Sequence, residues 1–246
     1  MSLILAVFLL IIGFILLTKG ADYFIENSAS FAEEKGISPH VVGVTIVAFG
    51  TSLPELLVSI ISSIQGYNDL ALGNIVGSNI SNIGLVLSVS TFIFYYVLKT
   101  NILPDEDANN DSYVMLLAVL MLYFFAIDKS ISQIEGAVFF SLYIIYIFWL
   151  YKRTKGDEVS TDESKTSYMF LIGGLIALLI GAQLTVDSAV EIALAIGIPE
   201  IVIGLSVVAV GTSLPELAGT ISAARMGHKE IAVGNVIGSN LSLIHI

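Results

Sequence analysis

The chain has 246 residues, of which 56% are hydrophobic and only 13% are charged, whereas a soluble domain usually carries about 25% charged residues. With a mean hydropathy of +0.90, this composition indicates a protein that lies in lipid. The absence of cysteine excludes disulfides and thiolate metal sites. The net charge of −11 does not imply a basic partner, because much of the acid lies in two polar stretches, 105–111 and 157–163, that we expect to be solvated loops.

Several stretches are long and apolar enough to cross a bilayer, since a membrane helix needs about 17–25 mostly apolar residues. The first is no signal peptide, because no positive charge precedes it and no small-residue cleavage site follows it. The eight predicted spans are 3–19, 41–64, 70–98, 112–128, 132–151, 168–186, 201–223 and 230–246. The sequence therefore predicts an all-α, multi-pass membrane protein.

Lys and Arg residues indicate the orientation, because they are enriched in cytoplasmic connections. With the N-terminus outside, only Lys129 faces outward. The nine inward-facing basic residues are Lys19, Lys35, Lys99, Lys152, Arg153, Lys155, Lys165, Arg225 and Lys229. We expect a plasma-membrane protein with its N-terminus outside and a cytoplasmic loop at 152–167.

An internal repeat is the most informative feature of the sequence. The stretch GVTIVAFGTSLPEL at 43–56 recurs as GLSVVAVGTSLPEL at 204–217. The stretch GNIVGSN at 73–79 recurs as GNVIGSN at 234–240. Both pairs, and the weaker pair Gly20-Ala21 and Gly181-Ala182, lie 161 residues apart without a gap.

This offset covers five predicted helices, so the second copy crosses the membrane in the opposite sense. We expect an inverted-topology repeat, the architecture of many secondary transporters, with the substrate site near the midplane where the repeats meet. The expected divisions are 1–151 as the first repeat of five helices, 152–167 as the cytoplasmic loop, and 168–246 as a second repeat with helices six to eight.

Each GTSLPEL copy places a carboxylate, Glu55 or Glu216, about halfway along its predicted span. A lone charge at that depth costs a few kcal/mol or more, so two at related positions indicate a function. The alternative is a pair of protonated glutamates that bond to neighbouring helices. We favour the functional interpretation because the polar residues around both glutamates recur as well.

Proline and threonine complete the pattern around each glutamate. Pro54 has no N–H to donate to the helix, so we expect a broken helix with unpaired carbonyl oxygens, and Pro215 repeats this. Thr51 lies four residues before Glu55 and therefore on the same face, as Thr212 does for Glu216. Carboxylates, carbonyls and hydroxyls together form an all-oxygen site, which hard cations such as Ca²⁺ prefer.

The GNxxGSN segments combine small residues, which let helices approach closely, with polar ones. Ser78, Asn79, Ser239 and Asn240 can supply ligands or hydrogen bonds, although close packing alone remains the alternative. The segments are not phosphate loops, because no Lys-Ser/Thr pair follows the glycines. The three histidines, His40, His228 and His245, lie near span ends, where we expect them to be interfacial.

The doubled GTSLPE and GNxxGSN segments resemble the two alpha repeats of the cation/calcium antiporters, and the nearest branch is similar to the prokaryotic sodium/calcium exchangers. The resemblance covers essentially the whole chain. It implies ten helices in two inverted groups of five and exchange of Na⁺ for Ca²⁺ by alternating access. The metal ligands that it implies are Glu55, Glu216, Thr51, Thr212, the carbonyls of Ala48 and Ala209, Ser78, Ser239 and Asn82.

The chain departs from the family pattern in two ways. The position that corresponds to Asn82 in the second half is Leu243, which is apolar. The second repeat also ends within its eighth helix, so we expect the chain to be C-terminally truncated relative to the family.

The leading hypothesis is therefore a Na⁺/Ca²⁺ antiporter in the lipid bilayer, with no enzymatic activity, no cofactor, no nucleic acid and no obligatory protein partner. A calcium/proton antiporter using the same glutamates is the nearest alternative. A potassium-dependent exchanger is less favoured, because that branch tends to have an aspartate where Asn82 stands. A cation channel is a different class, but channels more often form by symmetric oligomerisation around a pore. Nothing in the sequence supplies a metal or nucleophile for an intramembrane enzyme.

Overall fold

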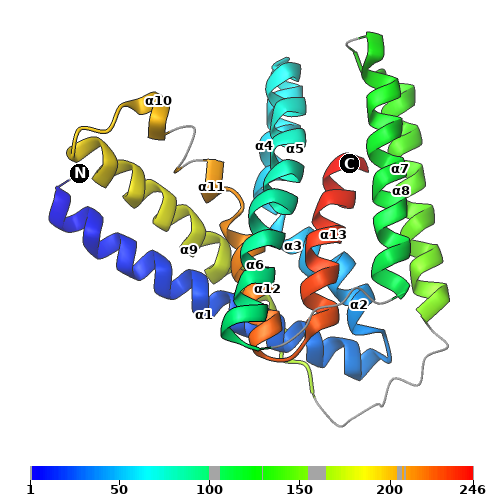
Figure 1. Ribbon diagram of the computed structural model, residues 1–246, viewed down its shortest axis with the longest axis horizontal. Helices are drawn as coiled ribbons and strands as arrows, with labels where there is room; N and C mark the ends of the chain where they lie inside the picture. The colour runs from blue at the N-terminus through cyan, green and yellow to red at the C-terminus, as the bar shows by residue number, and fades with distance from the viewer. Residues whose placement is uncertain are drawn as a thin grey trace.

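The computed structural model describes residues 2–99, 106–128, 130–154, 165–203, 207 and 209–245. Within these ranges the chain forms helices and turns without any strand, which confirms the predicted all-α class (Figure 1). Lys129, Lys155 and the acidic stretch 157–163, which we used for the orientation and the loops, lie outside the described residues.

Among the helices of the described residues, η1, η2 and η3 are π-helical and η4 is a 3₁₀ turn. The helices are α1 (Leu3–Lys35), α2 (Pro39–Val42), η1 (Gly43–Val47), α3 (Ala48–Thr51), α4 (Leu53–Ile64), α5 (Asn68–Ser81), η2 (Asn82–Leu87), α6 (Ser88–Phe92), η3 (Ile93–Val97), α7 (Glu106–Phe125), η4 (Ala126–Asp128), α8 (Gln133–Thr154), α9 (Tyr168–Ala195), α10 (Glu200–Ile203), α11 (Ala209–Gly211), α12 (Leu214–Arg225) and α13 (Lys229–His245).

Five of the described helical segments are long and apolar enough to cross a membrane: Leu3–Lys35, Asn68–Val97, Ala108–Phe125, Gln133–Arg153 and Tyr168–Ala195. The pair Pro39–Thr51 and Leu53–Ile64 passes the same test as one span bent by 55°. The predicted span 201–223 corresponds to α10, α11 and α12, and the span 230–246 corresponds to α13.

Helix α1 extends well beyond its predicted end at residue 19. Charged and polar side chains follow Leu17, so the apolar pattern stops there, but the helix continues to Lys35 and ends where Gly36 adopts the left-handed conformation with φ of 60°. The extension is held by tertiary contacts, since Asp22 accepts hydrogen bonds from Ser222 (2.7 Å) and Arg225 (2.5 Å) of α12. The prediction that Lys19 lies in a connection between helices was wrong, because this residue is inside α1.

Helices α1 and α9 pack against each other through paired glycines. A Cβ atom on Gly20 would lie 2.3 Å from the backbone nitrogen of Leu178, and one on Gly181 would lie 2.2 Å from that of Leu17. A second matched pair is Gly13, which faces Thr185, and Gly174, which faces Phe24. Because higher numbers on α1 meet lower numbers on α9, these corresponding helices run antiparallel.

The later helices of the two halves are also related by inversion. The turn between α4 and α5 lies at one end of the molecule, and the turn between α12 and α13 lies at the other (Figure 1). This arrangement agrees with the inverted repeat that the odd offset predicts.

Helix α13 lies deepest in the structure, and every residue from Gly234 to His245 is buried. A Cβ on Gly238 would come within 2.3 Å of the Val44 carbonyl oxygen, so α13 packs directly on the backbone of η1. It therefore inserts a second-half helix between first-half elements. The glycines of the second GNxxGSN copy do serve close packing, whereas a Cβ added at Gly73 or Gly77 of the first copy would meet no atom of the described residues within 4 Å.

Three polar residues that we placed at interfaces or in a loop, His40, His245 and Asp111, are buried. His40 is 1% exposed, and its Nε2 lies 2.5 Å from Oδ2 of the fully buried Asp111 on α7. His245 is 5% exposed and lies against the Phe139 and Tyr143 rings. The interfacial prediction was wrong for both histidines, because a polar side chain near a span end can be enclosed by helices that are distant in sequence.

Candidate cation site

The two glutamates occupy equivalent places at the start of a half-helix. Ser52 leaves the helical conformation with φ −87° and ψ 7°, and α4 begins at the next residue with Glu55 in its first turn. Ser213 repeats this with φ −92° and ψ 6°, and Glu216 lies in the first turn of α12. The predicted broken helices are thus confirmed. A carboxylate in the first turn of a helix is favoured by the helix dipole.

The carboxylates of both halves are buried inside the protein. Glu55 is 2% exposed and Glu216 is 1% exposed, and they are close enough to interact electrostatically. Ser52 of the first half donates a hydrogen bond of 2.8 Å to Oε1 of Glu216. This contact connects the first helix break to the second-half carboxylate.

The carbonyl of Ala48 is a second place where side chains of both halves are in contact. It accepts hydrogen bonds from the Thr51 hydroxyl at 3.2 Å and from the Ser239 hydroxyl at 3.4 Å. Thr51 is completely buried, and its single hydroxyl proton is shared between the Ala48 carbonyl and Asn235 Oδ1, which lies 3.1 Å from the hydroxyl oxygen. Three of the predicted ligands, Ala48, Thr51 and Ser239, are therefore in direct contact.

Several buried oxygen atoms around the breaks have no hydrogen-bond donor among the described residues. These acceptors are Oε2 of Glu55, Oε2 of Glu216, Oδ1 of Asn79 and Oδ1 of Asn82. The Asn82 amide is oriented by its N–H group, which donates to Asn240 Oδ1 at 3.1 Å. Buried polar atoms are nearly always paired, so a group of unpaired acceptors suits a site that holds positive ions.

The second-half break is less enclosed than the first. Thr212 is exposed whereas Thr51 is buried, and Ser213 pairs with Ser81 at 2.7 Å whereas Ser52 pairs with Glu216. Ala209 lies in α11, and Ser78 is buried on α5. The structure thus brings several of the predicted ligands together around Ala48, Thr51 and Glu216, whereas Thr212 is exposed.

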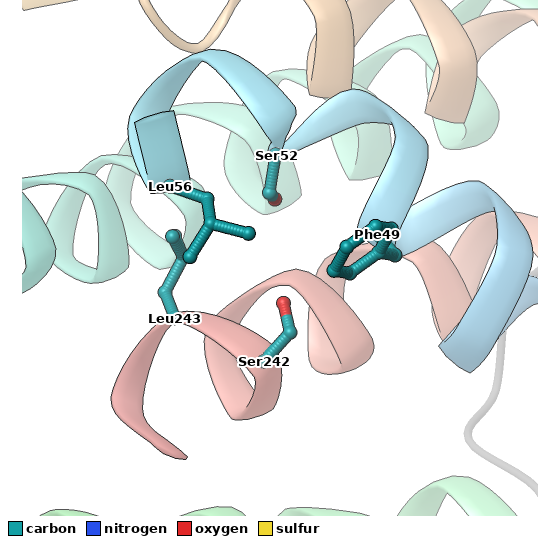
Figure 2. Close-up of a pocket in the computed structure, with 5 residues that line it drawn as sticks. All are labelled: Phe49, Ser52, Leu56, Ser242 and Leu243. Carbon is teal, nitrogen blue, oxygen red and sulfur yellow. The ribbon is translucent and has the colours of Figure 1, made fainter. Parts of the chain in front are cut away.

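A small pocket adjoins Ser52 on the side of α13. It is lined by Phe49, Ser52, Leu56, Ser242 and Leu243, and the Ser52 and Ser242 side chains project toward each other across it (Figure 2). Leu243 is 2% exposed. The position that corresponds to Asn82 therefore presents an apolar side chain beside the hydroxyl that bonds Glu216.

Three residues at the site were not among the predicted ligands. Ser52 bonds Glu216, and Asn74 and Asn235 bond the backbones of the two glutamates. All three belong to the doubled motifs, so the repeat itself was the signal that could have found them.

Comparisons with known proteins agree with this geometry. The family described as "Sodium/calcium exchanger protein" matches residues 5–152 and 166–246. The chain is 41% identical to an uncharacterized membrane protein of Methanocaldococcus jannaschii, over 98% of this chain and 79% of that protein. It is 35% identical to the sodium/calcium exchanger MaX1 of Methanosarcina acetivorans, over 97% of this chain and 80% of that protein.

A solved structure shares the fold. The sodium/calcium exchanger from Methanococcus jannaschii superimposes with a TM-score of 0.84 at 39% identity, covering 99% of this chain and 80% of that one. The family match over both halves includes the segments that carry Glu55 and Glu216. The chain therefore belongs to the sodium/calcium exchanger protein family.

Proposed function

We propose that this protein is a secondary active antiporter that exchanges Na⁺ for Ca²⁺ across the membrane by alternating access. The observation that carries the proposal is the contact between Ser52 of one half and Glu216 of the other, beside two buried carboxylates that each keep an oxygen without a donor among the described residues. Membership of the family and the similarity to the sodium/calcium exchanger MaX1 support the same assignment.

The proposed ligands all offer oxygen to the ion, as hard cations require. Glu55 and Glu216 supply the negative charge. The neutral ligands are Thr51, Thr212, the carbonyls of Ala48 and Ala209, Ser78, Ser239 and Asn82. In the structure, Thr51 and Ser239 donate to the Ala48 carbonyl, which places the three proposed oxygen ligands in contact with one another.

The charge of the site explains why exchange is obligatory. Two ionised glutamates carry a charge of −2, which one Ca²⁺ or two Na⁺ ions neutralise. With the site empty, two bare carboxylates in a low-dielectric interior repel each other, so closing the empty site costs free energy. The carrier therefore changes sides when loaded and seldom when empty.

The proposed arrangement in the membrane follows the distribution of basic residues. The N-terminus lies outside, residues 1–151 form the first repeat, residues 152–167 the cytoplasmic loop, and residues 168–246 the second repeat. The antiparallel packing of α1 and α9 supports inversion between the halves. We place the protein in the plasma membrane, where Na⁺ and Ca²⁺ are its substrates and where transport requires no protein partner.

Uptake of radioactive Ca²⁺ into proteoliposomes tests the proposal. Vesicles loaded with Na⁺ should accumulate Ca²⁺ from a Na⁺-free medium, and vesicles without the Na⁺ gradient should not. Glu55→Gln and Glu216→Gln should abolish uptake, because each removes half of the site's charge. Glu26→Gln, which alters an exposed glutamate on α1, is the matched control and should transport normally.

Other outcomes would identify another function. Uptake driven by a pH gradient and indifferent to Na⁺ would make the protein a calcium/proton antiporter. Flux that does not saturate and needs no counter-ion would make it a channel.

A further inference from the structure

Two asparagines that no ligand assignment includes bind the glutamate-bearing half-helices in the same way. Asn74 of α5 donates to the backbone carbonyl of Glu55 at 3.0 Å and to the Ser59 hydroxyl at 2.9 Å. Asn235 of α13 donates to the backbone carbonyl of Glu216 at 3.2 Å and to the Thr220 hydroxyl at 2.9 Å. Asn74 and Asn235 are 161 residues apart, which is the repeat offset, so the two sets of hydrogen bonds occupy equivalent positions in the two halves.

The geometry fixes each half-helix along its length. The carbonyl and the hydroxyl that each amide contacts belong to residues four positions apart, which lie on one face separated by a single turn. Both amide hydrogens are therefore used, and the side chain bridges a full turn of the neighbouring helix. This side-chain bridge defines the rotation of α4 against α5 and of α12 against α13.

Such a bridge matters here because the helix breaks just before each glutamate. Pro54 and Pro215 lack the N–H groups that would continue the hydrogen-bond ladder into the preceding half. The backbone that precedes the break therefore constrains the first turn of α4 and α12 only weakly. Contacts from the adjacent helix must define where Glu55 and Glu216 point.

We propose that Asn74 and Asn235 are paired positioning residues that hold the two carboxylates toward the transported cation. This inference rests on the proposed function, because it concerns how the same site binds its ions. Asn235 has a further part, since its Oδ1 accepts the Thr51 hydroxyl at 3.1 Å and so ties the first-half break to the second-half glutamate. Neither asparagine touches the ion in this scheme.

Equilibrium binding of radioactive Ca²⁺ to the purified full chain in detergent, with competition by Na⁺, tests the inference. Asn74→Leu and Asn235→Leu remove the hydrogen bonds while keeping the number and branching of the side-chain heavy atoms. We expect each to weaken Ca²⁺ binding about 10- to 100-fold, the range seen when groups that orient metal ligands are lost. Ser59→Ala and Thr220→Val remove one acceptor each and should weaken binding about 2- to 10-fold, within the value of a single hydrogen bond.

A control separates positioning from general stability. Asn27 of α1 also donates to a backbone carbonyl, that of Tyr23 at 2.8 Å, within its own helix. Asn27→Leu should therefore lower the melting temperature without changing Ca²⁺ affinity. The melting temperature of every variant is measured without cations, and binding is measured well below the lowest value.

The outcomes separate this inference from the proposed function. Absence of Ca²⁺ binding by the unsubstituted protein would overturn the proposed function and this inference with it. Binding that Glu55→Gln abolishes but that Asn74→Leu and Asn235→Leu leave unchanged would overturn only the positioning role. A lower melting temperature with unchanged affinity in the asparagine variants would likewise assign them a structural role.

Discussion

The contact between α1 and α9 gives a prediction that is independent of transport. At Gly20 and Gly181 an added Cβ would lie 2.2–2.3 Å from a backbone nitrogen of the opposite helix. Ordinary van der Waals contact begins near 3.4 Å. Because the opposing atoms are backbone, no side chain can rotate away, and Gly20→Ala or Gly181→Ala must separate the helices by about 1 Å.

The cost of this separation can be estimated. Overpacking of a close-packed contact costs about 1–3 kcal/mol, and about 2 kcal/mol lowers the melting temperature of a protein of this length by about 5 °C. Gly20→Ala and Gly181→Ala should be equally harmful, since their distances are nearly the same. The double variant should cost less than both together, because the first substitution has already separated the helices.

Adjacent glycines on α9 provide the control. Gly173 has no described atom within 4 Å of its Cβ position, whereas the Cβ of Gly174 would lie 2.6 Å from the Phe24 nitrogen. Gly173→Ala should be neutral or slightly stabilising, since Ala favours helix by about 1 kcal/mol, and Gly174→Ala should destabilise. Thermal unfolding in detergent, followed by circular dichroism, measures the four single variants and the double variant. Equal melting temperatures for the Gly173 and Gly174 variants would refute the predicted contact.

Three further predictions concern single contacts. His40→Leu or Asp111→Leu alone should destabilise the protein by about 1–3 kcal/mol because each removes the contact between these two buried side chains, whereas the double variant should recover most of the loss; a double variant that is worse than either would contradict this. Gly36→Ala should cost about 1–2 kcal/mol at φ 60°, with Gly36→Asn milder, in the same unfolding assay, and equal stability would argue against the left-handed cap. Ser52→Ala should weaken Ca²⁺ binding about 10-fold by removing the donor to Glu216, whereas Ser30→Ala, on the exposed side of α1, should leave binding unchanged.

The repeated motifs predicted the most about this protein. The all-α class and the break before Glu55 and Glu216 follow from local chemistry, because the effects of proline, glycine and an intramembrane carboxylate depend on the residues beside them. The family was predicted from the resemblance of the doubled motifs. The repeat offset showed that the two halves are separated by an odd number of predicted helices. The sequence alone could therefore predict that the two halves cross the membrane in opposite directions.

Contacts between segments that share no motif could not be predicted in the same way. Helix α1 continues past Leu17, where Asp22 accepts hydrogen bonds from Ser222 and Arg225 of α12. The pattern of apolar residues along α1 could not predict these contacts, because they come from a distant part of the chain. The burial of Asp111 depends on His40 from another helix, so its sequence neighbourhood indicated a loop. The unequal burial of Thr51 and Thr212 could not be predicted from the two GTSLPEL copies, because the letters of these copies are identical.

The glycine contact between α1 and α9 also bears on how the two halves could have arisen. Gly20 faces Leu178 while Gly181 faces Leu17, so each partner of the pair has its equivalent on the other helix, as in the isologous interface of a two-fold dimer. A single half would thus carry, in one helix, a surface complementary to a second copy of itself inserted in the opposite direction. Joining the copies in one chain turns an association that depends on concentration into an intramolecular contact, which the tether keeps at a high effective concentration.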